Sequence, residues 1–144
     1  MKKDKKMEVK SLNSPDEVRA FDKGKLELIN IGGATIGRAV FEPGWRWSTS
    51  VKPLVNTKSC QAPHFQYHIS GTLKIVMDDG TEKECKAGDV SLLPSGHDAW
   101  VMGNEPVVVV DFQGMVDYAK KFAKKDDGLG GKDSNLVGNV NVAI

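Results

Sequence analysis

Over most of its length the chain alternates short apolar, β-branched runs with turn-forming residues. The runs are roughly four to eight residues long and are separated by Gly-Gly, Pro-Gly, Asp-Gly and Pro-Ser-Gly, which is typical of the strands of an all-β sandwich or barrel. The best hairpin signal lies between LKIVM and EKEC, where the sequence is Asp78-Asp79-Gly80, because Asp-Gly readily adopts the positive φ angles of tight primed turns. The pattern therefore predicts an all-β fold that contains this hairpin.

Two segments carry helix signals instead. Ser-Pro-Asp-Glu at residues 14–17 has the order of an N-cap, a first-turn proline and first-turn acids, and it predicts a short helix over residues 16–22. Residues 115–125 place apolar side chains at a helical period with lysines on the other face, which predicts an amphipathic helix. After a glycine-rich link, the final VNVAI alternates apolar and polar residues, which predicts a strand.

Composition and charge fit one soluble, cytoplasmic domain. The chain has 144 residues, and its 20 Lys and Arg against 19 Asp and Glu give a net charge of +1, so no global field favours nucleic acid or an anionic membrane. No run approaches the ~20 apolar residues of a membrane span, and the basic start lacks the apolar stretch of a secretory signal. Cys60 and Cys85 are expected to be reduced thiols in such a compartment.

Two segments resemble the sequence motifs of the cupin superfamily. Residues 88–96 match the Gly, Pro and Gly of the second motif, G-x5-P-x-G-x2-H, and Gly71 closes a stretch similar to the first motif, G-x5-H-x-H-x3-4-E-x6-G. The resemblance is narrowest to small single-domain, cupin-2-like barrels. It implies a double-stranded β-helix, or jelly roll, over residues 27–114, after an N-terminal arm with a short helix at 1–26. Residues 115–144 would add the C-terminal helix and the tail with its strand.

The metal-binding positions of that family carry other residues in this chain. The place of the motif glutamate falls on His64, those of the two motif histidines fall on Lys58 and Cys60, and that of the second-motif histidine falls on Ala99. None of the four usual ligands is present. The resemblance therefore implies the fold, and the metal chemistry has to be argued from the residues that remain.

A different set of ligand types remains near the same place. In the resembling fold, residues 61–63 form a turn that folds Cys60 and His64 toward each other, and His97 lies two residues before the place of the second-motif ligand. Cys60, His64 and His97, with water in a fourth position, would suit zinc or ferrous iron. Two other interpretations stay open: Cys60 is a small buried apolar residue, or Cys60 and His64 form a nucleophile and its base.

The same strand and the tryptophans suggest a binding pocket. Gln66 and His68 share a face with His64 because strand side chains alternate, but His68 is about 13 Å along the strand from His64 and belongs to a deeper layer. Trp45 and Trp47 are expected on one strand face, with Arg46 facing the other way. Trp100 follows the second motif and is expected to point inward. The tryptophans are interpreted either as core packing or as the lining for a small organic ligand, with Arg46, Lys52 or Lys58 as an anion contact.

Two functional hypotheses follow. The first is a small-molecule-binding cupin with a non-standard metal site, acting as a metal-dependent isomerase, lyase or oxygenase. The second is a metal-free ligand-binding or sensory module without catalysis. For either one we expect a small organic ligand as partner, no nucleic acid and no membrane. We also expect a homodimer to which the C-terminal segment contributes, because the alternating apolar residues of VNVAI need a partner.

Overall fold

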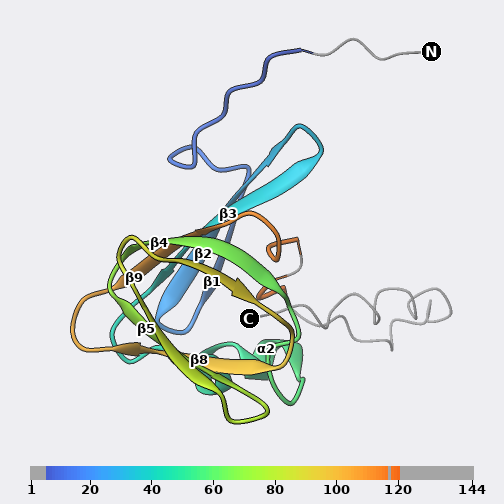
Figure 1. The fold of residues 1–144 in the computed structure, drawn as a ribbon. Coiled ribbons are helices and arrows are strands. Elements are labelled where there is room, and N and C mark those ends of the chain that lie inside the picture. The colour runs from blue at the N-terminus through green and yellow to red at the C-terminus, as the bar shows by residue number, and fades with distance from the viewer. Residues whose placement is uncertain (1–5, 117, 121–144) are drawn as a thin grey trace, which may run out of the picture.

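A computed structural model describes residues 6–116 and 118–120, which form two antiparallel sheets packed face to face (Figure 1). In their order across the larger sheet, its strands are β1 (Glu17–Phe21), β2 (Gly24–Ile31), β3 (Ala34–Phe41), β9 (Val107–Asp111), β4 (His64–Ser70) and β7 (Val90–Leu93). The smaller sheet consists of β6 (Glu82–Lys86), β5 (Thr72–Met77) and β8 (His97–Met102). The predicted all-β class is confirmed.

The hairpin predicted at Asp78-Asp79-Gly80 is confirmed. β5 and β6 pair antiparallel on either side of it, with Val76 opposite Glu82. Gly80 has φ +94°, and the backbone N–H of Met77 donates to the carbonyl of Thr81 at 2.8 Å. A local signal decides this turn, because glycine adopts a positive φ without a steric penalty.

The helix predicted over residues 16–22 is wrong, because most of this segment is strand β1. Val18 lies opposite Glu27 in an antiparallel pair with β2. The Asp16 carboxylate, expected in the first turn of a helix, accepts the backbone N–H of Asn30 at 2.8 Å instead. A helix of so few residues is only marginally stable by itself, whereas the strand gains its hydrogen-bond ladder from the edge of an existing sheet.

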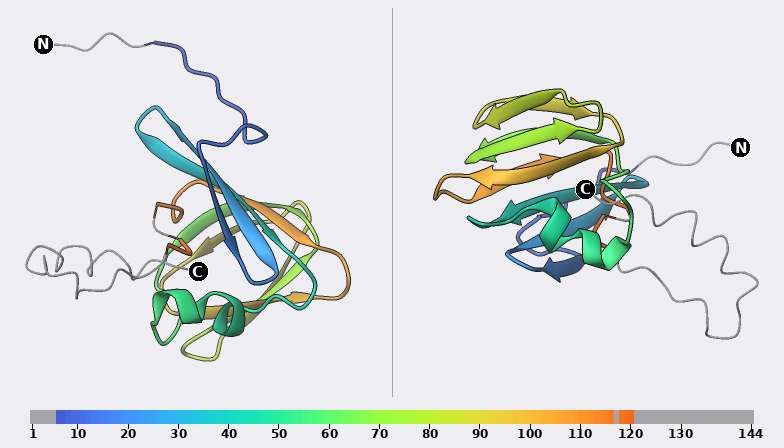
Figure 2. Two further views of the ribbon diagram at one scale, coloured as in Figure 1. Left: turned by 180° about the vertical axis from the view of Figure 1, so that it is seen from behind. Right: turned by 90° about the horizontal axis from the view of Figure 1, so that it is seen from below.

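Two one-turn helices, α1 (Trp47–Ser50) and α2 (Lys52–Val55), lie near one end of the barrel beside β8 (Figures 1 and 2). Asn56 ends the second helix in the left-handed conformation, with φ 62°. The expectation that Trp45 and Trp47 share a strand face is therefore wrong: Trp45 lies in the loop before α1, and Trp47 is the first residue of that helix.

The C-terminal helix predicted over residues 115–125 is absent where the structure describes the chain. Residues 115, 116 and 118–120 form bends and a turn, and Ala119 has φ 56°, which an α-helix does not accommodate. The rest of that segment and the predicted VNVAI strand lie outside the described residues. Within the described part of the chain, no helix is long and apolar enough to span a membrane.

The hydrophobic core lies between the two sheets. Trp45 closes part of it by stacking on Phe41, with 4.0 Å between the ring centroids. Other fully or nearly fully buried members are Leu26, Leu28, Ala39, Leu73, Ile75, Ala99, Val107 and Val109. These apolar side chains surround a smaller set of buried polar ones, which are described next.

Candidate metal centre

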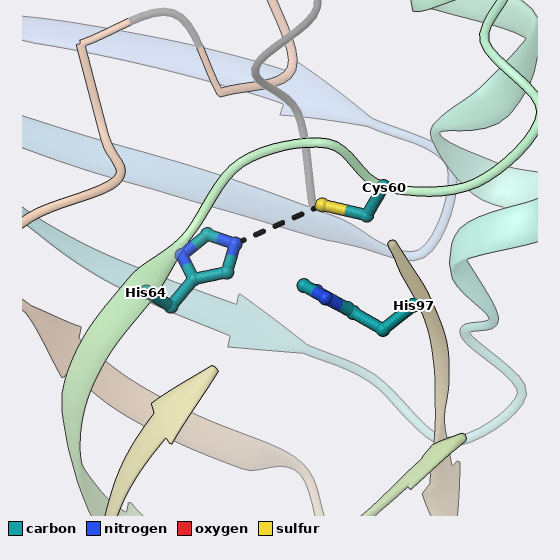
Figure 3. Close-up of side chains that lie close together, drawn as sticks. All are labelled: Cys60, His64 and His97. Atoms are coloured by element: carbon teal, nitrogen blue, oxygen red, sulfur yellow. Dashed lines mark hydrogen bonds between the residues drawn. The ribbon is translucent and has the colours of Figure 1, made fainter. Parts of the chain in front are cut away.

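Three side chains with metal-ligand chemistry meet inside the barrel (Figure 3). Cys60 precedes β4, His64 is the first residue of β4, and His97 is the first residue of β8. All three are fully buried, and one ligand atom from each lies within 4.8 Å of the others. The structure therefore brings together the three residues that the sequence indicated as a metal site.

Backbone hydrogen bonds hold Cys60 and His97 against each other across the two sheets. The N–H of Cys60 donates to the carbonyl of His97 at 2.8 Å, and the carbonyl of Cys60 accepts the N–H groups of Gly96 and His97 at 2.6 and 3.2 Å. The positions of Cys60 and His97 thus depend on main-chain geometry, not on side-chain choice alone.

The orientation of His64 is set by Asp111, the fully buried last residue of β9. The Nδ1–H of His64 donates to one carboxylate oxygen of Asp111, and the other oxygen accepts the N–H groups of Gln113 at 2.9 Å, Gly114 at 3.1 Å and Phe65 at 3.3 Å. Burial opposes the charged form of Asp111, but the hydrogen bond and the charge of His64 hold the pKa of its carboxyl below the usual range. The Nε2 atom of His64 is left facing the Sγ atom of Cys60 at 3.9 Å.

His97 keeps one ring nitrogen for an ion. Its Nδ1–H donates to the carbonyl of Pro94 at 2.9 Å, so Nε2 carries the lone pair, and this buried atom has no hydrogen-bond partner among the residues that the structure describes. Burial, with the nearby His64 as a second cause, lowers the pKa of His97 to about 4. The imidazole is therefore neutral at pH 7, which is the form that binds metals.

The donor set fits a divalent ion of intermediate softness. One sulfur and two imidazole nitrogens are typical ligands of zinc and also suit ferrous iron. Burial raises the pKa of the Cys60 thiol well above its ordinary value, and a bound cation would stabilise the thiolate instead. The same burial works against Cys60 as a nucleophile without an ion. Lys58 is exposed and Ala99 offers no donor, so neither adds to the set.

Two further polar side chains line the inner face of β4. Gln66 is 1% exposed and His68 is fully buried. The Nε2 atom of His68 pairs with the hydroxyl of Ser91 at 2.8 Å, but its Nδ1 atom and both amide atoms of Gln66 have no hydrogen-bond partner. Burial lowers the pKa of His68, so this layer offers neutral hydrogen-bonding groups.

The tryptophans do not converge on one pocket. Trp45 and Trp47 are fully buried in the core. Trp100 lies on the outer face of β8, between inward-facing Ala99 and Val101, and the Arg46 guanidinium carbon lies 4.1 Å from its ring centroid. The expectation that Trp100 points into the barrel is wrong, because strand alternation turns it outward.

A cavity of about 380 Å³ lies between the edge strands β6 and β7. Its wall includes Ile75, Cys85, Ser91, Leu93 and Pro94. Three of these residues adjoin polar residues of the interior: Ser91 bonds to His68, the carbonyl of Pro94 accepts from His97, and Leu93 lies opposite His64 in the β4–β7 pair. The cavity therefore adjoins the cluster and the deeper polar layer through its wall, and Cys60, His64, Gln66, His68 and His97 do not line it.

Two residues next to the cluster escaped the sequence analysis, namely Asp111 and Tyr118. One feature of the sequence could have indicated Asp111. It follows Val107 and Val109 at alternate positions, on the inward-facing side of β9, where a charged side chain needs a partner. Tyr118 is fully buried, with its ring 5.9 Å from that of His64. It lies in a segment without regular structure, and no pattern in the sequence indicates its place.

No protein-family profile matches the chain. Among curated proteins, large ribosomal subunit protein bL31 of Sinorhizobium medicae and of Rhizobium meliloti is 37% identical over 75 residues, covering 46% of this chain and 92% of bL31. The matched segment resembles bL31 in sequence. It covers less than half of the chain, whereas the sheets run from Glu17 to Asp111, so the match does not describe the barrel.

Solved structures share the fold of the whole barrel. Oxalate decarboxylase of Lactobacillus farciminis, solved as a formate complex, superposes with a TM-score of 0.52 and 18% identity over 71% of this chain, which spans only 32% of the decarboxylase. A protein of unknown function from Rhizobium leguminosarum bv. viciae gives 0.51 and 17% identity over 76% of this chain and 97% of its own. Other neighbours are described as cupin-like or as double-stranded β-helix proteins. The predicted double-stranded β-helix is confirmed, and at these identities the likeness concerns the fold alone.

Proposed function

This chain has the fold of the cupin superfamily, and we propose that it is a metal-dependent enzyme acting on a small organic molecule, of the isomerase, lyase or oxygenase class. Cys60, His64 and His97 would hold one zinc or ferrous ion. Three protein ligands leave a fourth position for the reacting molecule, as in catalytic metal sites. The bound ion would supply Lewis-acid polarisation of an oxygen atom, or redox chemistry if it is iron.

One observation carries this proposal: the Nε2 atom of His97 is buried and has no hydrogen-bond partner among the described residues, and one ring nitrogen of His97 lies within 4.8 Å of ligand atoms from Cys60 and His64. An unsatisfied buried polar atom costs about 1–3 kcal/mol. A cation among these three atoms would remove that cost at His97 and would stabilise the thiolate at Cys60. The atoms face one another in a water-excluding interior (Figure 3).

The surrounding residues support the same assignment. Asp111 fixes the tautomer and ring orientation of His64, an arrangement that commonly raises the basicity of a metal-binding histidine. Pro94 fixes His97 in the same way through its carbonyl. Both imidazoles therefore keep Nε2 for an ion without a change of ring orientation.

The reacting molecule would lie in the cavity of about 380 Å³ between β6 and β7, a volume near the lower end of usual ligand pockets. Its wall is mixed, with apolar Ile75 and Leu93 on one hand and charged Lys83, Glu84 and Asp89 on the other, so it suits a molecule with both a hydrocarbon body and polar groups. Gln66 and His68 would bind neutral hydroxyl, carbonyl or amide groups, because neither side chain carries a charge near pH 7.

A metal-free binding or sensory module is the second candidate. The observation in its favour is that the cavity and the unpartnered atoms of Gln66 and His68 exist independently of the Cys60 cluster. In that case the same molecules would bind with no ion present and would not be converted.

Metal titration of the purified full-length chain separates the two candidates. We expect one Zn²⁺ or Co²⁺ per chain, and affinity at least a hundredfold lower in His64→Ala and in His97→Ala. His68→Ala is the matched control, since His68 is equally buried in the same barrel, and its affinity should stay within about threefold of the wild type. Absence of stoichiometric binding, or an equal loss in the control, contradicts the metal centre.

We also propose that the protein is a homodimer that uses the outer face of the larger sheet. This face, formed by β4, β7 and the end of β9, exposes Phe65, Tyr67, Ile69, Val90, Leu92 and Phe112 to between 44% and 73%. Monomeric proteins rarely expose so many neighbouring apolar side chains. None of these six residues is charged, so two copies of the face can meet without opposing like charges.

A further inference from the structure

Tyr118 is packed directly against the candidate metal centre. Its ring meets His64 edge-on, with centroids 5.9 Å apart and an interplanar angle of 82°, and it also touches Phe21 and Phe41 at 6.0 and 6.5 Å. The side chain is fully buried, and no residue that the structure describes is a hydrogen-bond partner of its hydroxyl. A buried phenol normally finds a partner for its O–H group, so this hydroxyl requires an explanation.

Arg19 holds Tyr118 in place from the opposite end of the chain. One terminal nitrogen of its guanidinium donates to the carbonyl of Tyr118 at 2.7 Å and to that of Met115 at 3.5 Å, and the other donates to the carbonyl of Val116 at 2.9 Å. The Nε atom of the same group is paired with Glu17 at 2.7 Å. The planar fork of an arginine is suited to fixing several acceptors at once. A strand near the N-terminus thereby positions a segment that has no regular structure of its own.

The metal ligands cannot supply a proton to a bound molecule. The Nδ1–H of His64 is used by Asp111, the Nδ1–H of His97 is used by Pro94, and the Nε2 atom of each histidine would bind the ion. The Tyr118 ring packs against one of these ligands, and its hydroxyl is a hydrogen-bond donor.

We propose that Tyr118 is a further residue of the centre, whose hydroxyl donates a hydrogen bond to the small oxygen-bearing or anionic molecule bound to the ion, and that Arg19 is its positioning residue. This inference rests on the proposed metal centre. If Tyr118 has this role, the centre prefers a molecule that has a hydrogen-bond acceptor next to the atom that binds the ion.

Azide binding to the Co²⁺-loaded full-length protein tests the role of Tyr118, because azide occupies an open metal position and accepts a hydrogen bond. We expect Tyr118→Phe to bind Co²⁺ within about threefold of the wild type and azide about tenfold more weakly, as measured by the visible absorption of cobalt. Tyr67→Phe is the matched control, since Tyr67 is the only other tyrosine and is 44% exposed on the outer face of β4. Unchanged azide affinity in Tyr118→Phe overturns the proposal.

A double-mutant cycle tests Arg19. Arg19→Gln should weaken azide binding about as much as Tyr118→Phe, and the double variant should lose no more than either single one, because Arg19 acts through Tyr118. Losses that add show that Arg19 does not act through Tyr118. An intact cobalt stoichiometry shows that the variants fold. If the wild type binds no cobalt, the metal centre and this inference fail together, whereas cobalt binding with unchanged azide affinity removes this inference alone.

Discussion

Two consecutive strands, β4 and β5, distribute their side chains in opposite ways. β5 follows the usual pattern: Leu73 and Ile75 face the core at 0% and 3% exposure, and Lys74 on the other face pairs with Glu82 at 2.9 Å. β4 is inverted. Its inner residues His64, Gln66 and His68 are polar and at most 1% exposed, whereas its outer residues Phe65, Tyr67 and Ile69 are apolar and 44–46% exposed.

The comparison separates two kinds of residue. Those of β5 stabilise the barrel, whereas those of β4 do not, and we propose a functional role for them. Buried polar groups without partners lower stability, and contiguous exposed apolar side chains favour association. β5 has neither feature, and its inner side chains stabilise the hydrophobic core. β4 has both, with chemistry proposed on its inner face and a protein contact proposed on its outer face.

The largest effect on stability is expected when an inward-facing apolar residue of β5 is replaced with a polar one, as found on the inner face of β4. Ile75→Gln removes a buried apolar side chain and buries an amide, so we expect the free energy of unfolding to fall by about 3–5 kcal/mol in urea titration. Lys74→Gln on the outer face of the same strand should change it by less than about 1 kcal/mol. A mild effect of Ile75→Gln would mean that the inner face of β5 tolerates polar groups as that of β4 does.

The buried polar interior should make the metal-free protein sensitive to acid. The pKa of His97 is about 4 in the folded state and about 6.5 in the unfolded chain. As pH falls, the unfolded state therefore takes up the proton first. Stability is fully present above pH 6.5, is lost between pH 6.5 and 4, and is affected no further by this group below that. The shift corresponds to about 3 kcal/mol, and the lowered pKa of His68 acts in the same direction.

Unfolding free energies measured across this pH range, for the wild type and for His97→Gln, check the prediction. The variant should show a shallower loss of stability between pH 6.5 and 4, because it lacks one group that protonates on unfolding. Equal slopes for the two proteins would show that the pKa of His97 is the same in the folded and unfolded states.

A gain in stability is expected when β4 is made more like β5. Gln66→Leu replaces a buried amide whose two polar atoms are unpartnered with an apolar side chain of similar size, so the free energy of unfolding should rise by about 1–2 kcal/mol. Binding of small neutral ligands should be lost at the same time. A loss of stability in chemical denaturation would show that the amide has a partner within the fold.

The smallest change in the stability of the single chain is expected on the outer face. Leu92→Lys, at a site 73% exposed, should alter the free energy of unfolding by less than about 0.5 kcal/mol, yet weaken dimerisation at least tenfold in sedimentation equilibrium. Val18→Lys is the control, since Val18 is 55% exposed on β1, at the opposite edge of the same sheet. A monomeric wild type, or equal disruption by Val18→Lys, contradicts the proposed interface.

The structural predictions made from the sequence were most accurate where neighbouring residues decide the conformation. The turn at Asp78-Asp79-Gly80 needs only a residue that tolerates positive φ, and it formed as expected. The convergence of Cys60, His64 and His97 was also predicted, because the cupin motifs fix the strand positions next to them. In the first case the information lies within a few residues, and in the second it lies in two separate motifs that match those of a known fold.

Predictions failed where distant partners decide the structure. Residues 17–21 carry a helix signal but pair with β2, and a local preference yields to a complete hydrogen-bond ladder. Tyr118 packs beside the centre, and its carbonyl is bound by Arg19, 99 positions earlier. Nothing in the local sequence around Tyr118 contains that information.

X-ray absorption spectroscopy of the Zn²⁺-loaded protein tests the central claim most directly, because it measures the atoms bound to the ion. The predicted first shell contains one sulfur at about 2.3 Å and two imidazole nitrogens at about 2.0–2.1 Å, with one light atom completing four-coordination. Cys60→Ser should remove the sulfur scatterer, and His68→Ala should leave the spectrum unchanged. A shell without sulfur, or one made only of oxygen atoms, would contradict a centre built from Cys60, His64 and His97.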